Sequence, residues 1–158
     1  MQLTGTHLLN APVPTVWAML MDTDTLARVV PAVSKLEKTG DNEFKAIAEV
    51  KMGPVNGSFS GSLTLSDIRE NEGYTLNVKQ NSKIGNADAT IAILLKPVAD
   101  NQTEISFDGN ARLSGLLART GQRVISGVAT TLTKQFFSNF EEALAGNSVS
   151  SAQAIPGE

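Results

Sequence analysis

The chain has 158 residues, 41% of them hydrophobic and 18% charged, with no cysteine and a single histidine. This composition is typical of one soluble globular domain. It excludes a disordered chain, a disulfide framework, a thiol nucleophile, a cysteine-bound iron–sulfur cluster and structural zinc. Thirteen Lys and Arg against sixteen Asp and Glu give a net charge of -3. Nucleic-acid binders normally carry a basic excess, so no nucleic-acid partner is expected.

The N-terminal segment is predicted to form one strand followed by two short helices. Residues 2–9 are typical of a strand. The prolines of Ala11-Pro12-Val13-Pro14 favour the first turn of a helix of about ten residues, because proline fixes φ and needs no amide hydrogen there. Asp22 and Asp24 supply capping oxygens for a second short helix, which ends before Pro31. A carboxylate pair with a chemical role is the alternative interpretation of these two aspartates.

From residue 33 onward the hydrophobic period changes to two, which is typical of consecutive antiparallel strands. Apolar and polar residues alternate in segments such as 44–50 and 105–111, so each strand has one buried face and one solvated face. Six strands fit between turn signals at Gly40-Asp41-Asn42, Gly53-Pro54, Asn71-Glu72-Gly73, Asn81 to Asn86 and Ala99-Asp100-Asn101.

One long helix is predicted from Ser114 to Ala145, because this segment contains no proline and carries a continuous apolar stripe. The tail 146–158 is rich in Ser, Ala and Gly and is expected to be flexible. The order of elements predicts a single α+β domain over 1–145. Its fold class is a helix-grip fold, in which a curved seven-stranded antiparallel sheet wraps around the C-terminal helix.

His7 is the one candidate for histidine acid–base chemistry. It lies in a predicted strand, and the sequence identifies no partner that would orient its ring. We therefore interpret His7 as a structural or solvated histidine and predict no catalytic residue.

Small residues interrupt the core-facing rows of several predicted strands. Gly53, Gly57 and Gly61 share one face of a strand, and a fully packed core would prefer larger side chains there. Such glycines either permit sharp sheet curvature and close approach of the helix or leave space for a ligand. The second interpretation predicts an apolar cavity lined by Ala46, Ala48, Val50, Gly57, Phe59, Gly61, Leu63, Leu76, Val78, Ala89, Ile91, Phe107, Gly109, Ala111, Leu117, Val124, Ile125, Val128 and Leu132.

Hairpin parity brings the turns at 51–57 and 80–86 and the junction at 112–116 to one end of the sheet. Basic and apolar residues gather there, and the mixture predicts a cavity entrance that meets anionic lipid headgroups or an acidic partner. Ordinary solvated lysines around loops are the alternative. The residues of this predicted surface are Lys51, Met52, Gly53, Pro54, Val55, Lys83, Ile84, Arg112, Leu116, Arg119 and Arg123.

Several motifs together resemble those of the G subunit of carbon monoxide dehydrogenase, a branch of the START-like superfamily that also holds polyketide cyclases and lipid carriers. The more specific motifs are Gly53-Pro54-Val55 and Gly121-Gln122-Arg123-Val124-Ile125. Ala11-Pro12 followed by Val16-Trp17 is shared more widely across the superfamily. The sequence departs from the family pattern at Ala32, where a glycine is usual after the proline, and in a shorter 80–86 loop.

The resemblance implies a non-enzymatic accessory protein that binds a lipid or quinone and links a molybdenum hydroxylase, such as carbon monoxide dehydrogenase, to the membrane. It implies no metal or cofactor in this chain. The first 22 residues lack the pattern of a secretory signal, so we expect a cytoplasmic protein that associates peripherally with the inner face of the membrane. A cyclase or dehydratase of the same fold and an interaction module with a filled core are the alternatives.

Overall fold

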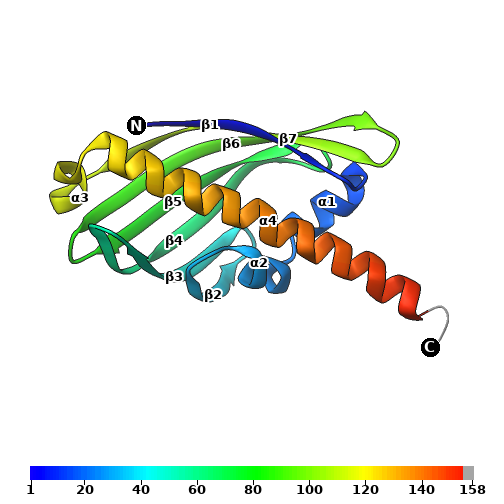
Figure 1. Cartoon of the computed structure of the whole chain (residues 1–158), viewed down its shortest axis with the longest axis horizontal. Helices are drawn as coiled ribbons and strands as arrows, with labels where there is room; N and C mark the ends of the chain where they lie inside the picture. Colours follow the sequence, from blue (N-terminus) through cyan, green and yellow to red (C-terminus); the bar gives the residue numbers. More distant parts are fainter. Residues whose placement is uncertain (155–158) are drawn as a thin grey trace.

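The computed structural model describes residues 1–154, with side chains described for residues 1–146. In Figure 1 the long helix α4 crosses one face of a curved sheet, and two short helices follow the first strand. The elements are β1 (Gln2–Leu9), α1 (Val13–Leu20), α2 (Thr23–Val29), β2 (Val33–Gly40), β3 (Glu43–Met52), β4 (Val55–Arg69), β5 (Gly73–Ser82), β6 (Gly85–Ala99), β7 (Gln102–Leu113), α3 (Gly115–Thr120) and α4 (Gln122–Ala154).

All seven strands form one antiparallel sheet in the order β1-β7-β6-β5-β4-β3-β2. Consecutive hairpins build the sheet from β2 to β7, and β1 then pairs with β7 at the far edge. The predicted helix-grip architecture is therefore confirmed, including the seven strands and the two short helices after the first of them.

The strand register places the small and apolar residues of the alternating pattern on the same face of the sheet. Ala46 pairs with Gly61, Leu63 with Val78, and Ile91 with Gly109. We call this surface the concave face. It is the side that α4 covers, because Phe107 of β7 stacks on Phe137 of α4 with ring centroids 6.3 Å apart.

Asp22 caps α2, as the sequence predicts. The backbone N–H of Thr25 donates to Asp22 Oδ2 at 3.3 Å, and the Thr25 hydroxyl donates to the same oxygen at 2.5 Å. The hydroxyl hydrogen bond is the main reason why the pKa of this carboxyl is lowered. Asp24 lies in the first turn of the helix, where a negative charge is favourable.

The C-terminal helix is not the single helix predicted from Ser114 to Ala145. It is broken between α3 and α4 at Gly121, whose φ of +108° lies outside the helical region. The helix α4 then continues to Ala154, beyond the domain boundary predicted at residue 145. Residues 155–158 lie outside the described residues, and the flexibility expected for 146–158 stays a prediction.

Ala32 adopts a φ of +68°, in the left-handed region that residues with a Cβ rarely occupy. This is the position where the sequence resemblance leads us to expect glycine. The carbonyl oxygen of Ala32 accepts a hydrogen bond from the backbone N–H of Glu49 at 2.8 Å. That bond ties the link between α2 and β2 to strand β3.

The buried side chains form two separate clusters. The larger cluster gathers around Trp17, Tyr74 and Phe140, at the end of the sheet that α1 and α2 cover. The smaller one, around Phe59, Leu117 and Ile125, lies at the end where α3 packs. A central band of the concave face belongs to neither cluster and is only half-buried; it includes Leu63, Val78, Ala89, Ile91 and, on α4, Leu132.

Candidate ligand-binding site

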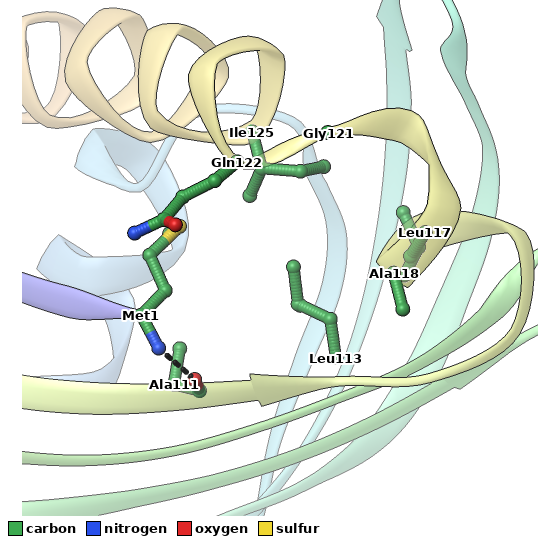
Figure 2. A pocket seen from close by; sticks show the side chains of 8 residues that line it. All are labelled: Met1, Ala111, Leu113, Leu117, Ala118, Gly121, Gln122 and Ile125. Carbon is green, nitrogen blue, oxygen red and sulfur yellow. Dashed lines mark hydrogen bonds between the residues drawn. The ribbon is translucent and has the colours of Figure 1, made fainter.

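A cavity of about 190 Å³ lies where the end of β7 meets α3 and the first turn of α4 (Figure 2). Its walls come from four stretches of the chain, with the sheet on one side and the two helices on the other. The lining residues are Met1, Ala111, Leu113, Leu117, Ala118, Gly121, Gln122 and Ile125.

The turn between β5 and β6 holds α3 in place over the sheet. The backbone N–H of Leu117 donates to the carbonyl of Ile84 at 2.9 Å, and that of Ser114 donates to the carbonyl of Asn86 at 3.0 Å. Two glycines make this joint possible. A Cβ on Gly85 would collide with the carbonyl oxygen of Ser114, and a Cβ on Gly115 would lie 3.0 Å from the Gly85 Cα.

Met1 forms the wall of the cavity opposite α3, as Figure 2 shows. Its nitrogen donates to the carbonyl of Ala111 at 2.8 Å, and the N–H of Ala111 donates to the Met1 carbonyl at 2.7 Å. The Ser126 hydroxyl lies 3.7 Å from the Met1 sulfur. These contacts place the flexible thioether between β7 and α4.

The lining of the cavity is apolar except for the amide of Gln122, and none of the eight residues carries an ionisable side chain. Such a surface gains free energy when it contacts an apolar group instead of water. The volume of about 190 Å³ is below the ~300–1,000 Å³ of sites that enclose a whole drug-sized ligand. The cavity therefore suits one end of a longer apolar molecule.

Three of the residues predicted to line a cavity do so: Ala111, Leu117 and Ile125. The other strand residues of that prediction lie on the concave face, as the register requires, without lining this cavity. The lining residues that the sequence analysis missed are Met1, Leu113, Ala118, Gly121 and Gln122. Extending the alternation of Gly109 and Ala111 by one step would have found Leu113.

Three predicted cavity residues need correction. A Cβ on Gly61 would collide with the backbone carbonyl of Lys79, and one on Gly109 would lie 2.6 Å from Ile91 Cγ1. These glycines allow close approach of the neighbouring strand, so they leave no space for a ligand. Val124 is 37% exposed and belongs to the outer surface. At Gly57 a Cβ would meet only Ile84, at 3.8 Å, so this position does have room.

The predicted basic surface is also only partly as expected. Val55 is buried, and Met52 and Ile84 pack against the smaller core cluster, so these three do not form an apolar tip. Lys51 and Arg112 alternate with concave-face residues and therefore lie on the outer face of the sheet. The exposed residues that remain around α3 are Gly53, Pro54, Lys83, Leu116, Arg119 and Arg123.

His7 has a partner that the sequence analysis did not identify. Its Nε2 lies 2.9 Å from Oε2 of Glu141 on α4, and its ring stacks on Phe137 with centroids 4.3 Å apart. The expectation of an unpartnered strand histidine is therefore wrong. Glu141 and the cavity residue Ile125 are sixteen residues apart on α4, or about 24 Å at 1.5 Å per residue. The pair is therefore remote from the cavity.

A second hollow, of about 480 Å³, lies over the bulge in β4 and is lined by Asp67, Ile68, Arg69, Tyr74, Thr75, Ala92 and Leu94. Thr75 and Ala92 alternate with concave-face residues, so this hollow opens on the outer side of the sheet. Burial raises the pKa of the Tyr74 phenol. The charged and polar lining is less suited to an apolar ligand than the cavity at α3.

Two further features bear on the chemistry of the described part of the chain. Among the described residues there is no group of three or more His, Asp or Glu side chains that could hold a metal ion. No described helix is long and apolar enough to cross a membrane.

Among solved structures, the chain is similar to a conserved protein from Geobacillus kaustophilus, with 28% sequence identity and a TM-score of 0.89 over 92% of this chain and 96% of that chain. A START superfamily protein from Mycobacterium smegmatis has the same fold, with 11% identity and a TM-score of 0.71 over 92% of this chain and 97% of that one. The di-domain ARO/CYC BexL from the BE-7585A biosynthetic pathway matches with 11% identity and a TM-score of 0.68, over 92% of this chain and 46% of that one.

The last two likenesses show the START-like fold alone, because so little sequence is shared. A comparison with curated proteins gives no match. The family model of CoxG, the G subunit of carbon monoxide dehydrogenase, matches residues 5–145, which include both core clusters and most of the cavity lining. The chain therefore belongs to the CoxG family of carbon monoxide dehydrogenase.

Proposed function

We propose that this protein is a non-catalytic carrier that holds a lipid or quinone between the concave face and the C-terminal helices. The observation that carries the proposal is the apolar cavity at α3, which continues into a half-buried apolar band of the sheet. One end of a long molecule fits the cavity, and the rest lies along Ala89, Val78 and Leu63. Each Å² of apolar surface that leaves water contributes roughly 25 cal/mol.

The ligand enters and leaves at a membrane surface. Leu116 is 56% exposed and Val124 is 37% exposed, and both lie beside the cavity wall formed by α3 and the start of α4. Arg119 and Arg123 are exposed on the same two helices. Exposed apolar side chains beside arginines match an anionic bilayer, because headgroups attract the cations while the hydrocarbon accepts the apolar groups.

The partner in this proposal is a molybdenum hydroxylase such as carbon monoxide dehydrogenase, after which the family is named. The protein would link that enzyme to the membrane by passing the apolar ligand between them.

An enzyme of the cyclase type is the second candidate, and the His7–Glu141 pair is the observation that favours it, because a paired histidine can transfer protons. About 24 Å of helix separates the pair from the cavity, so a molecule bound at α3 would have to be long to reach it. Loss of function in His7→Ala with the fold intact would support the enzyme.

Filling the cavity should abolish ligand binding. Ala118 lines the cavity but is itself exposed on α3, so Ala118→Trp blocks the space without disturbing a core contact. We expect at least a tenfold loss of affinity for a short-chain quinone such as decylubiquinone, measured by calorimetric titration. Organic extraction of protein purified without detergent, followed by mass spectrometry, should show the same loss of co-purified lipid.

Ala27→Trp is the matched control, since Ala27 is an exposed alanine on the short helix α2, outside the cavity lining. It should bind the quinone like the wild type. If neither the wild type nor the control retains or binds a lipid or quinone, the carrier proposal fails and the filled-core interaction module replaces it.

Reversing the charge near α3 should weaken membrane association. We expect Lys83→Glu, Arg119→Glu and Arg123→Glu together to lower binding to anionic phosphatidylserine-containing vesicles by tenfold or more in a sedimentation assay. Raised salt should have the same effect on the wild type, because exposed charges are screened over ~8 Å at physiological ionic strength.

The control for this experiment changes three exposed lysines away from α3, with the same change in net charge: Lys38→Glu, Lys45→Glu and Lys96→Glu. An equal loss in both triple variants would mean that only net charge matters. That result would contradict a specific membrane-facing surface.

A further inference from the structure

The side chain of Gln80 presents a buried donor without an acceptor. Its Nε2 atom is inaccessible to solvent and has no hydrogen-bond partner among the described residues. It is the single buried side-chain nitrogen or oxygen of the described part of the chain in this condition. Because a buried, unpaired amide N–H is unfavourable, its presence calls for a physical explanation.

The surroundings of Gln80 explain why the amide has no partner. Gln80 lies on the concave face of β5, paired with Gly61 of β4 on one side and Ala87 of β6 on the other. Neither neighbour has a polar side chain. Ser82, the next residue of β5 on this face, already donates to the carbonyl of Gly85 at 2.6 Å and accepts from the N–H of Ile84 at 3.2 Å.

The register connects Gln80 to the cavity. Gln80 pairs with Ala87, and Ala87 pairs with Leu113, which lines the cavity. Two strand spacings separate Gln80 from Leu113, which is about 10 Å. A ligand with one end in the cavity therefore reaches Gln80 by crossing β6 at Ala87, where the small side chain offers little obstruction.

We propose that Gln80 is a specificity-determining residue of the ligand site, where its amide donates a hydrogen bond to a carbonyl oxygen of an otherwise apolar ligand. This inference rests on the proposed carrier function and names the ligand class more closely. The ligand is a neutral, oxygen-bearing apolar molecule, such as a ketone, ester or quinone. A pure hydrocarbon leaves the amide unpaired, whereas a carbonyl oxygen satisfies it in surroundings of low dielectric constant, where hydrogen bonds are strong.

The test compares two probes of equal chain length, 2-dodecanone and n-dodecane, by displacement of a fluorescent apolar dye. The wild type should bind the ketone at least tenfold more tightly than the alkane, a difference of about 1.4 kcal/mol. Gln80→Met keeps the length of the side chain and removes the amide. It should bind the two probes with equal affinity, and its affinity for the alkane should equal that of the wild type.

Two further measurements separate a binding role from a structural one. Ligand-free Gln80→Met should have a Tm at or above that of the wild type, because an unpaired buried donor has been removed. Asn81→Met removes an exposed amide from the next position of β5, on the outer face, and should keep the tenfold preference for the ketone.

The outcomes distinguish this inference from the proposal on which it rests. If both probes bind and the ketone preference is the same in the wild type and Gln80→Met, the role of Gln80 is refuted and the carrier function stands. If neither probe displaces the dye from the wild type, the carrier function fails and the role of Gln80 fails with it. A lower Tm for ligand-free Gln80→Met would show that the amide is structural.

Discussion

Phe140→Ala is expected to lower the free energy of unfolding by about 3–5 kcal/mol, the range for removing a large buried aromatic side chain. Phe140 is only 1% exposed and belongs to the larger core cluster. Its ring lies 5.8 Å from that of Phe136, centroid to centroid. Replacing it with alanine leaves a cavity beneath α4 that the surrounding sheet cannot easily fill. Urea denaturation followed by circular dichroism measures the loss.

Phe136→Ala provides the comparison, because Phe136 is nearby on α4 but only half-buried. Its expected loss is smaller, since less apolar surface returns to water on unfolding. Equal losses in the two variants would contradict the placement of Phe140 at the centre of the larger cluster.

Gly85→Ala is expected to lower the free energy of unfolding by at least about 2 kcal/mol and to displace α3. Gly85 has a φ of +132°, which alanine rarely adopts, and the new Cβ would collide with the carbonyl oxygen of Ser114. Because α3 supplies Leu117 and Ala118 to the cavity, quinone affinity should fall as well.

Gly127→Ala is the matched control for this prediction. A Cβ at Gly127 has no atom within 4 Å, and the residue is exposed in the interior of α4. Alanine favours a helix over glycine by about 1 kcal/mol, so this variant should be more stable than the wild type. The two glycine-to-alanine variants should therefore shift Tm in opposite directions, and a shared direction would show that the β6–α3 joint is not tight.

The architecture was predictable because the hydrophobic period of each segment is a local property. Alternation identified the strands between residues 33 and 113, and the capping role of Asp22 followed from its position before a helix. The break at Gly121 had a local signal as well, a glycine within a helical pattern, but a positive φ is not visible in a periodicity. An uninterrupted apolar stripe therefore suggested one helix where there are two.

The details of the site depended on contacts between distant parts of the chain, which periodicity cannot describe. His7 and Glu141 are 134 positions apart, and only the fold brings them together. Gly61 and Gly57 are equivalent by alternation, yet a Cβ on the first would collide with a neighbouring strand and a Cβ on the second would not. The local curvature of the sheet decides between these two environments.

The division of the core into two clusters has a consequence for how the molecule opens. Thirteen of the described side chains form the cluster around Trp17, whereas five form the cluster beside α3. Regions with fewer buried apolar contacts open at lower free energy than the rest of a domain. Amide hydrogens of α3 should therefore exchange with solvent through partial openings that leave the Trp17 end folded. Such breathing would let a bulky ligand pass without global unfolding, and it would occur at the end of the molecule where the cavity lies.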